Sequence, residues 1–596
     1  MKKTSVLKKV LRYSAPYLPY FVLALICAVI SVSLTLYIPV LVGRAIDNII
    51  AQGNVNFGNI AEIIIYILMA IGGVALFQWA MNYCTNAISY KTVRDLRRDV
   101  FKKFNTTPLS YIDSHPHGDL ISRVVNDVDA VGDGLIQMIT QLFSGVVTIV
   151  GTLIFMLSID VKIALLVVFI TPLSLFVAAF IGKLTGKRFR QQQELQGEIS
   201  GYVEEYVGNQ QIVKAFSYEE RSFENFEKYN DRLYTVGLKA QIAGALANPC
   251  TRFVNGLVYA SVGIFGALTA VSGGITVGGL SCFLTYANQY TKPFNEVTGV
   301  LTQLQTAVAA AKRVFQVLEE PAETPDKEPA KEDNAIDKTQ DNPQKGTVEF
   351  KNVCFSYSQN KPLIEDFSLK VRPGEHIAIV GPTGCGKTTL INLLMRFYDV
   401  TGGEILVDGT DIRNIPRNDL RSRFGMVLQD SWLFEGTIKE NLLYGNENAT
   451  DEQVVAAAKH AYAHSFIMRM EKGYDTVITR DGSNLSQGQK QLLCIARAML
   501  SNPSMLILDE ATSSIDLLTE QRVQKAFAKM MQGRTSFVVA HRLSTIKESD
   551  LILVMNKGNI VEQGTHEELL EKKGFYYDLY NSQFAVQKFI MEQKML

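Results

Sequence analysis

The sequence carries no net charge, because 59 lysine and arginine residues balance 59 aspartate and glutamate residues. Nucleic-acid binding needs an excess of positive charge, so a nucleic-acid partner is not expected. The seven cysteines form no Cys-x-x-Cys pair and have no metal-ligand spacing, which favours reduced, packed thiols over a zinc site or a disulfide framework. His115 and His117 lie close together, but without further ligands nearby they predict a solvated turn rather than a metal site.

A cleavable signal peptide is also missing from the pattern, since a basic N-terminus precedes a long apolar run without a small-residue cleavage site. About 20 apolar residues cross a bilayer as a helix, and the first half of the sequence contains repeated runs of that kind. A soluble bundle of amphipathic helices is the alternative, but so many runs favour spanning helices. The expected spans are 20–42, 60–83, 135–159, 162–181, 253–271 and 277–298.

The last two spans are less apolar than the others. They are interrupted by Asn255, Asn288, Gln289, Tyr290 and Lys292, as expected for helices that line a wet cavity.

The distribution of lysine and arginine predicts the orientation of these spans. Both residue types are concentrated at the N-terminus and in segments 90–123 and 183–190, whereas the short turns 158–161 and 272–276 contain neither. We therefore expect the two basic segments and both termini in the cytoplasm.

The chain between spans two and three, and again between spans four and five, is long, polar and helix-periodic. Ordinary connections are much shorter. The simplest structure extends each membrane helix into the cytoplasm and reverses it at a short elbow. The expected elbows are 111–118 and 215–220.

Composition also indicates the domain boundaries. Segment 319–346 is rich in proline and charged residues and nearly free of apolar ones, which predicts a flexible linker. We therefore expect a transmembrane domain over 1–318 and a second domain over 347–596, in which strands and helices alternate.

A phosphate-binding P-loop opens this second domain. The stretch Gly381-Pro382-Thr383-Gly384-Cys385-Gly386-Lys387-Thr388 fits G-x-x-x-x-G-K-[ST]. Its backbone N–H groups and the following helix N-terminus would hold phosphates. Lys387 would reach the β- and γ-phosphates, and the Thr388 hydroxyl would contact Mg²⁺. A chance glycine-rich turn is the alternative, but an apolar strand before the loop and a helix after it favour the P-loop.

Two acidic residues follow an apolar strand at Met505–Leu508. Asp509 would bind Mg²⁺, and Glu510 would orient or deprotonate an attacking water at the end of the strand. Without a P-loop, these acids would suit a buried strand that ends in solvent equally well.

Four further positions carry polar or aromatic groups at suitable places. Gln429 and His541 each follow an apolar strand, and Tyr357 could stack on adenine. Ser486 precedes a helix and offers a hydroxyl and backbone amides to an anion.

The order of these motifs resembles the nucleotide-binding domain of an ABC (ATP-binding cassette) transporter. With six spans fused ahead of it, the chain is similar to a bacterial multidrug half-transporter: a multidomain protein with a six-helix all-α transmembrane domain (the type I/type IV exporter fold) followed by an α/β P-loop domain. The matching residues are Tyr357, Gly381–Thr388, Gln429, Leu485–Gln489, Met505–Glu510, Ser513–Asp516 and His541, which correspond in turn to the adenine-stacking loop, Walker A, Q-loop, signature, Walker B, D-loop and H-loop.

The resemblance implies a dimer with two ATP molecules between the nucleotide-binding domains, each held by Walker A of one chain and the signature of the other. Glu510 would be the general base, and His541 would position the γ-phosphate. Thr388, Gln429 and Asp509 would lie at Mg²⁺. The implied ATP-binding residues are Tyr357, Gly381, Pro382, Thr383, Gly384, Cys385, Gly386, Lys387, Thr388, Thr389, Gln429, Ser486, Gly488 and Asp509.

The implied activity is ATP hydrolysis that drives export of amphipathic or hydrophobic small molecules by alternating access. The chain would lie in the bilayer of the cytoplasmic (inner) membrane, with the nucleotide-binding domain in the cytoplasm. Export of a lipid or peptide is the alternative within transport, although no Cys–His peptidase domain precedes the first span. An ATP-gated channel or regulator is the alternative of another class.

Two departures from the family pattern suggest a heterodimer. Gln487 replaces the first glycine of the Leu-Ser-Gly-Gly-Gln signature, and Arg480 stands where a glutamate is usual. A side chain at Gln487 crowds the approach of phosphate to the backbone. Because Walker A, Glu510 and His541 are intact, the pattern resembles the catalytically complete half of a heterodimer whose partner has a degenerate Walker B. A homodimer that tolerates Gln487 is the alternative.

Overall fold

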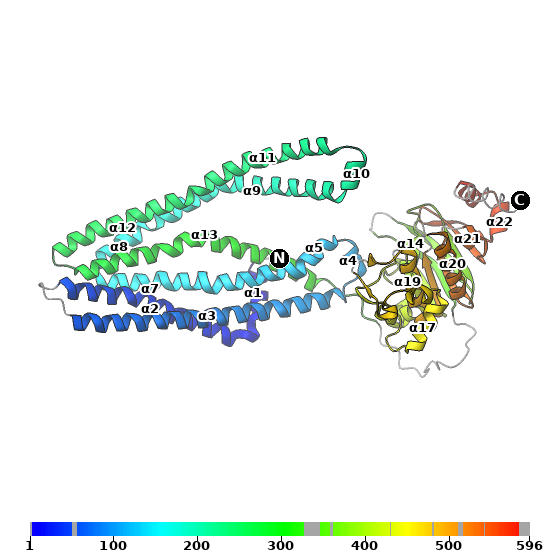
Figure 1. Cartoon of the computed structure of the whole chain (residues 1–596), viewed down its shortest axis with the longest axis horizontal. Helices are drawn as coiled ribbons and strands as arrows, with labels where there is room; N and C mark the ends of the chain where they lie inside the picture. Colours follow the sequence, from blue (N-terminus) through cyan, green and yellow to red (C-terminus); the bar gives the residue numbers. More distant parts are fainter. Residues whose placement is uncertain are drawn as a thin grey trace. The chain divides into compact units, whose positions relative to one another are not determined.

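The computed structural model describes residues 3–50, 57–326, 346–357, 362–429, 431–479, 482–509, 516–540 and 543–582. It divides into two compact units (Figure 1). We call Met1–Thr107 with His115–Pro321 the helical unit, and Pro108–Ser114 with Ala322–Leu596 the α/β unit. A short piece of the N-terminal half, residues 108–114, therefore belongs to the second unit.

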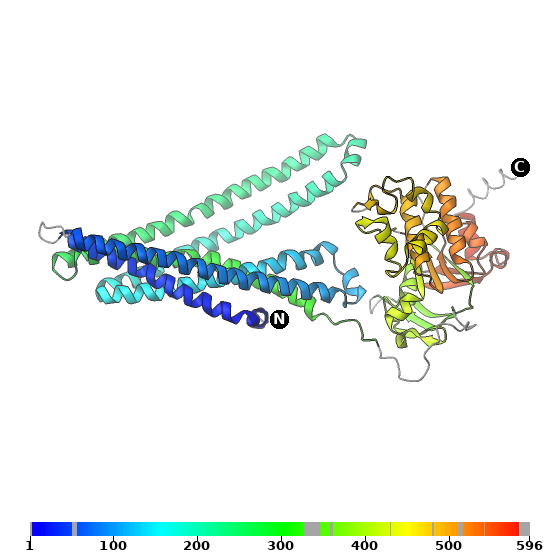
Figure 2. The same ribbon diagram turned by 60° about the horizontal axis from the view of Figure 1, so that its bottom comes forward.

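Long helices build the helical unit, and each expected apolar run lies within them. Figures 1 and 2 show α9 and α11 side by side up to the short α10. The main helices are α1 (Lys3–Ser14), α2 (Leu18–Ile50), α3 (Phe57–Phe104), α5 (His117–Ser122), α6 (Val128–Gln137), α7 (Ser144–Ile159), α8 (Val161–Ile170), α9 (Pro172–Gly208), α10 (Gln210–Ala215), α11 (Glu219–Ala245), α12 (Ala247–Val271) and α13 (Val277–Glu319).

Four helical stretches among the described residues are long and apolar enough to cross a membrane: Val6–Asn48, Phe57–Phe104, His117–Ile159 and Glu219–Val271. They contain four of the six expected spans. The other two expected spans do not meet the same measure. Helix α8 is shorter, and α13 carries Asn288, Gln289 and Lys292 within its apolar stretch.

The expected elbows are present. Helix α3 has 48 residues and so extends for about 72 Å at 1.5 Å per residue, more than twice the hydrocarbon thickness of a bilayer. The chain then forms α4 (Leu109–Asp113) and returns through α5; in the same way α9 leads through α10 into α11. Both elbow helices begin a few residues before the predicted positions.

Helices α2 and α13 make the closest crossing of the helical unit. A Cβ atom on Gly278 would lie 2.0 Å from the Gly43 carbonyl oxygen, so only glycine allows this approach. The Tyr286 hydroxyl donates to the Leu36 carbonyl at 2.6 Å, and the Gly278 N–H donates to Asp47 at 2.7 Å. These bonds satisfy polar groups inside an apolar bundle, where water cannot do so.

The α/β unit contains two main sheets. In the first, β1 (Val348–Phe355) pairs antiparallel with β2 (Ile364–Val371) and β4 (Gly402–Val407), and β5 (Thr410–Asp411) extends it. The second has the order β12-β11-β3-β10-β9-β6, in which all but β12 run parallel. Its strands are β3 (His376–Val380), β6 (Phe424–Val427), β9 (Met505–Asp509), β10 (Thr535–Val539), β11 (Leu551–Asn556) and β12 (Asn559–Gly564).

Helices cover the parallel sheet, whose central strands are buried nearly throughout: β9 and β10 are apolar runs with almost no exposed side chain. Such strands are typical of a sheet covered on both faces. The helices are α14 (Lys387–Leu394), α15 (Arg417–Ser422), α16 (Ile438–Leu443), α17 (Asp451–His460), α18 (His464–Ile467), α19 (Gln487–Leu500), α20 (Leu517–Met531), α21 (Leu543–Lys547) and α22 (His566–Glu571). The predicted order, helical transmembrane part followed by an α/β part, is confirmed.

The α2–α13 crossing yields a stability prediction. Gly278→Ala forces the two helices apart, and we expect it to destabilise the fold by about 1–3 kcal/mol, the usual cost of overpacking. Thermal unfolding of the detergent-solubilised protein, followed by intrinsic fluorescence, measures the loss. Gly256→Ala in α12 is the control, because a Cβ there meets nothing within 4 Å. An unchanged melting temperature for Gly278→Ala would contradict the proposed close crossing.

Candidate functional site

The P-loop lies between β3 and α14, as its sequence predicts. Gly381, Gly384 and Gly386 have φ angles of 153°, 79° and 104°, a region that side-chain-bearing residues rarely adopt. A Cβ on Gly384 would face open space, so the loop leaves room on that side. The first N–H groups of α14 have no partner within the helix and are the donors that a phosphate needs.

The Lys387 ammonium holds the loop in shape. Its Nζ donates to the Gly381 carbonyl at 2.7 Å and to the Pro382 carbonyl at 3.1 Å. The loop is thus folded around the lysine, with the charge that would meet the phosphates already at its centre. Pro382 and Thr383 complete the turn, and Thr388 follows Lys387 in the first turn of α14.

A hairpin far along the chain supports the P-loop, and the sequence reasoning did not find it. The Gly558 N–H donates to the Cys385 carbonyl at 2.9 Å. A Cβ on Gly381 would lie 2.3 Å from the Met555 carbonyl oxygen. Lys557 and Gly558 both have positive φ, which favours the two-residue turn joining β11 to β12. That turn signal was visible in the sequence, but its contact with the P-loop was not. Cys385 itself is buried.

Strand register places the other predicted residues at the same sheet edge. Val539 of β10 pairs with Ile379 of β3 on one side and with Asp509 of β9 on the other. Leu508 pairs with Val427 of β6, so that Gln429 follows the neighbouring strand end. Because these strands are parallel, the P-loop, Asp509 and Gln429 all lie at their carboxyl ends, where ligands bind in open α/β sheets.

Several predicted residues lie outside the described residues. Glu510 follows Asp509 directly, and His541 follows the end of β10 by two positions, but neither is described. The same holds for Arg480 and for Ser513 of the D-loop. Asp516, the last D-loop residue, caps α20 by accepting the Thr519 N–H at 3.0 Å. That bond lowers the pKa of Asp516 below its ordinary value, so the cap stays ionised.

Tyr357 lies beside the P-loop helix. Its hydroxyl is 3.1 Å from the hydroxyl of the buried Thr389, in the first turn of α14. Its ring packs edge-on against Phe355 and Tyr398, with centroids 4.9 and 5.1 Å away, and remains 52% exposed. One face can therefore stack on a base.

The signature segment begins α19. Ser486 caps the helix: its hydroxyl accepts the Gln489 N–H, while its own N–H donates to the Gln489 side chain at 2.9 Å. Gly488 is buried and Gln487 is exposed in the same first turn. Within the described part of the chain, no hydrogen bond connects Ser486 or Gly488 to the P-loop, so the structure does not bring them together.

Arg497 of α19 fixes the loop that follows Gln429. Its guanidinium donates to the Asn441 carbonyl at 2.9 Å, to the Asn441 side chain at 3.1 Å and to the Trp432 carbonyl at 3.1 Å. Burial lowers the pKa of Arg497 from its ordinary value. Together with the Cys494 thiol, which lies 3.7 Å from the Trp432 carbonyl, Arg497 therefore holds the segment after the Q-loop against the signature helix.

The elbow helix α4 belongs to the α/β unit, and its Asp113 bonds to that unit. The Tyr398 hydroxyl donates to Asp113 at 2.6 Å. Burial, reinforced by the Asp113 carboxylate, raises the pKa of Tyr398, so the hydroxyl keeps its proton and remains a donor at neutral pH. Tyr398 also touches Tyr357 and thus connects the elbow with the residue predicted to stack on adenine.

The residues present suit a phosphate ligand better than a metal held by protein alone. Among the residues that the structure describes, no group of three or more His, Cys, Asp or Glu side chains gathers to hold a metal ion. Thr388, Asp509 and Gln429 could each offer one oxygen at the sheet edge, and Mg²⁺ takes a small share of ligands of this kind from protein when phosphates complete its shell.

Comparisons with known proteins agree with this geometry. The family model described as "ABC transporter transmembrane region" matches residues 21–294, and that described as "ABC transporter" matches residues 364–513. A Mycobacterium bovis fatty acid ABC transporter ATP-binding/permease protein is 41% identical over 532 residues, covering 89% of this chain and 83% of that protein. An ATP-dependent lipid A-core flippase of Syntrophus aciditrophicus is 34% identical (98% and 96% covered), and a Staphylococcus aureus protein named for multidrug export is 36% identical (97% and 100% covered).

The close packing of Gly381 predicts a loss of nucleotide binding on substitution. Gly381→Ala places a Cβ against the Met555 carbonyl and strains the loop, and we expect the Kd for ATP to rise at least about tenfold, or ~1.4 kcal/mol. Fluorescence titration with a labelled ATP analogue measures it.

Gly409→Ala is the matched control for backbone strain. Gly409 has a φ of 77°, but a Cβ there meets nothing within 4 Å, and it lies in the turn between β4 and β5. We expect this variant to lose about 1 kcal/mol of stability and to bind ATP normally. Normal binding by Gly381→Ala would show that the P-loop does not depend on this packing.

Proposed function

The chain belongs to the ABC transporters, as a half-transporter with fused membrane and nucleotide-binding parts, and on this premise we propose that it exports amphipathic small molecules as the catalytically complete half of a heterodimer. The family assignment already makes it an ATP-binding, multi-pass membrane protein whose ATPase activity drives export. The proposal adds the class of substrate, the nature of the partner and the roles of individual residues.

The roles in hydrolysis follow from the sheet edge. The γ-phosphate would take over the Lys387 contacts that now go to Gly381 and Pro382. Mg²⁺ would be held by Thr388, Asp509 and Gln429 and would neutralise charge on the phosphates. Glu510 would take a proton from the attacking water, and His541 would position the γ-phosphate. Their sequence positions, at the ends of β9 and β10, support both roles.

The heterodimer proposal rests on the position of Gln487. This residue occupies the exposed side of the first turn of α19, at the position where the family signature has glycine. An anion approaching the N–H groups of this turn would meet the glutamine side chain. This signature would therefore complete an ATP site poorly, whereas the residues of the Walker A loop are all in place.

The second elbow supports a dimer of some kind. Phe216 and Ile212, at and beside α10, are 78% and 57% exposed in the single chain, and a hollow of about 510 Å³ lies next to them. Large apolar side chains grouped at a helix end usually mark a protein interface. We propose that a second chain covers this end, as two chains acting together would require.

The polar residues of the helical unit support an amphipathic substrate. The side-chain oxygens of Gln137, Asn255 and Gln289 are buried and have no hydrogen-bond partner among the described residues. Unpaired amides in an otherwise apolar bundle suit a ligand that is mostly apolar with a few polar groups. Relatives of the chain are named for fatty acid, lipid A-core and multidrug transport, and a fatty acid is a molecule of this character.

The basic residues support the proposed orientation. Lys102 and Lys103 lie in the last turn of α3, and Lys214 lies in α10. We therefore propose that both elbows, the α/β unit and both termini lie on the cytoplasmic side of the cytoplasmic membrane.

The heterodimer predicts that the purified chain alone hydrolyses ATP weakly or not at all. Gln487→Gly should then raise the ATPase rate of the chain alone by at least about tenfold, since one recovered phosphate contact is worth ~1.4 kcal/mol. Steady-state phosphate release measures both. Robust ATPase activity from the unmodified chain alone would overturn the heterodimer and favour a homodimer.

Transport itself is tested with the complex purified together with its native partner and reconstituted into vesicles. We expect ATP-dependent movement of one of three probes: a lipophilic cationic dye, a fluorescent fatty acid or a fluorescent phospholipid. Glu510→Gln should abolish turnover and transport while ATP binding persists. Unimpaired turnover in Glu510→Gln would remove its assignment as general base, and ATP-dependent current without solute accumulation would favour a channel.

A further inference from the structure

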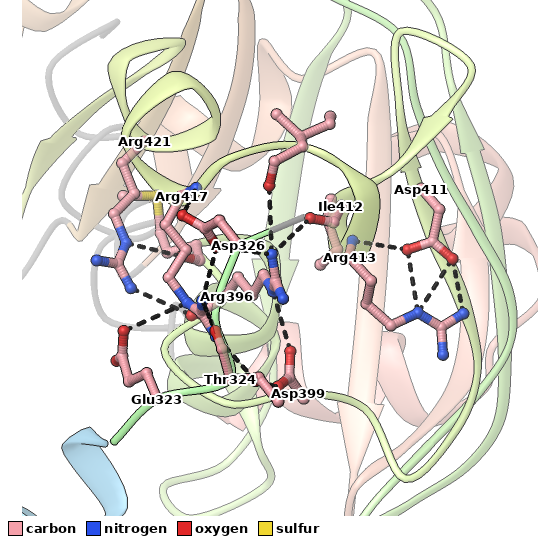
Figure 3. Close-up of polar contacts among 12 residues, drawn as sticks. Glu323, Thr324, Asp326, Arg396, Asp399, Asp411, Ile412, Arg413, Arg417 and Arg421 are labelled. Carbon is pink, nitrogen blue, oxygen red and sulfur yellow. Dashed lines mark hydrogen bonds and ion pairs between the residues drawn. The ribbon is translucent and has the colours of Figure 1, made fainter. Parts of the chain in front are cut away.

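The segment after α13 is fastened to the α/β unit by buried arginines. Composition predicted a flexible linker from residue 319, but α13 continues to Glu319 and residues 323–326 are bonded. We call Arg396 and Arg417, with Glu323, Thr324 and Asp326, the arginine clamp (Figure 3).

Arg417 makes most of the clamp contacts. Its Nη1 donates to the Thr324 carbonyl at 2.6 Å and to Asp326 at 2.7 Å, and its Nε is 3.3 Å from Glu323. Its backbone N–H donates to the other Asp326 oxygen at 2.8 Å. Asp326 therefore binds both the side chain and the first N–H of α15, which fixes its position closely.

Arg396 joins the same clamp from the end of the P-loop helix. Its Nη1 is 3.6 Å from Asp326 and donates to the Ile412 and Ile415 carbonyls at 3.1 and 3.2 Å. Its Nε donates to Asp399 at 3.0 Å, and Asp399 accepts the Thr324 hydroxyl at 3.3 Å. Figure 3 shows Arg396 and Arg417 pointing toward Asp326 from separate elements.

The burial of these charges makes the clamp persistent. The side chains of Arg396 and Arg417 are only 5% and 9% exposed. A buried guanidinium that loses its carboxylate is left with an uncompensated desolvation cost. Release of Glu323 and Asp326 would leave Arg417 in that state, so the segment is expected to stay attached.

The backbone of Arg396 also indicates that its side chain is needed. Helix α14 ends in the paired bonds of a Schellman motif, Arg396 N–H to Leu393 and Phe397 N–H to Asn392. The residue at this position normally is glycine, because it takes a left-handed conformation. Arg396 has a φ of 51° instead, and the strain is retained where the side chain reaches the clamp.

The same short loop carries the elbow contact. Residues 395–399 follow α14, which begins at Lys387 and is about 12 Å long. Tyr398 in this loop bonds Asp113 of the elbow α4, while Arg396 and Asp399 bond the segment after α13. Both routes by which the chain enters the α/β unit from α3 and from α13 thus meet on one loop, at the far end of the P-loop helix.

We propose that loop 395–399 is a junction at which a second coupling route joins the family's coupling through its elbow helices, and that Arg396 and Arg417 are positioning residues through which the P-loop helix moves the segment after α13. The inference rests on ATP-driven export alone and does not depend on the heterodimer or on the substrate class.

Arg417→Ala in the complex with its native partner tests the proposal. We expect the variant to retain most of its ATP hydrolysis. The ATP-dependent change in the helical unit should fall about fivefold, within the range by which single residues change coupling. The readout needs no substrate: a fluorophore on Ser272→Cys, in the exposed turn between α12 and α13, reports the ATP-dependent change. Arg417→Lys keeps the positive charge but loses the planar guanidinium that bonds two partners at once, so its coupling should lie between that of the unmodified chain and that of Arg417→Ala.

Arg413→Ala is the matched control. Arg413 makes two bonds of 2.6 and 3.0 Å with one oxygen of Asp411, and Figure 3 shows this pair apart from Asp326. It removes a paired arginine from the same region without touching the clamp, so coupling should be unchanged. A melting temperature for each variant shows whether the fold is intact.

Restored attachment provides the decisive arm. The Arg417→Ala variant, in a background without other cysteines, receives Thr324→Cys and Asp399→Cys, and a short bifunctional thiol reagent bridges the two cysteines. Because Ser272→Cys is then absent, the readout is transport of the fluorescent probe. Recovery of transport per ATP supports the junction. The proposal is overturned if coupling is unchanged in Arg417→Ala. It is also overturned if hydrolysis, coupling and melting temperature fall together and bridging does not restore them. If Arg417→Ala fails to fold, Asp326→Ala replaces it with the same expected outcome.

Discussion

Parallel hydrogen bonding among β3, β10, β9 and β6 is the constraint on which the nucleotide site depends. Because the strands run the same way and in register, their carboxyl ends share one edge, and whatever follows each strand is delivered there. The P-loop, Asp509 and Gln429 come from distant parts of the sequence, yet the strand order alone brings them to the same edge. Burial of the apolar strands on both faces maintains the register, so the core of the α/β unit and the chemistry at its edge have the same origin.

The helical unit obeys a different constraint, the need to satisfy backbone polar groups where water is absent. Continuous helices do this without partners, which is why α3 and α9 run unbroken from the apolar stretches to their elbows. Where two helices cross closely, as at Gly43 and Gly278, side-chain donors such as Tyr286 bond the remaining carbonyls. Helix α3, at about 72 Å, is more than twice as long as the hydrocarbon layer is thick, so its length leaves room for an elbow beyond the bilayer.

Sequence patterns that are local were predicted well, and contacts between distant segments were not. The P-loop, its strand and its helix are adjacent in sequence, and a parallel sheet explains the positions of Asp509 and Gln429. The contact of Gly558 with Cys385 joins segments that are far apart in the sequence, and neither segment has a pattern that predicts it. The linker shows the same limit, because Glu323 and Asp326 suggest a solvated tether by composition, while the buried arginines that bind them lie about a hundred residues later. Two expected spans also fell below a simple apolarity measure, because α8 is short and because Asn288, Gln289 and Lys292 lower the apolarity of α13.

Two attachments on one loop restrict the relative motion of the attached segments more than one attachment does. A hydrogen bond such as that between Tyr398 and Asp113 fixes a point but by itself allows rotation about it. A second anchorage through Arg396 and Asp399, a few residues away on the same loop, removes that freedom, so that a displacement of α14 is transmitted with its direction. Helix α14 is short and begins with Lys387, the residue predicted to meet the phosphates, and therefore little of its motion can be absorbed before it reaches the junction. Buried charge is well suited to the task, because a paired guanidinium resists separation more strongly than an exposed ion pair does. The strained backbone of Arg396 is consistent with this account, since a glycine would satisfy the helix end at lower cost but could not hold the segment that follows α13.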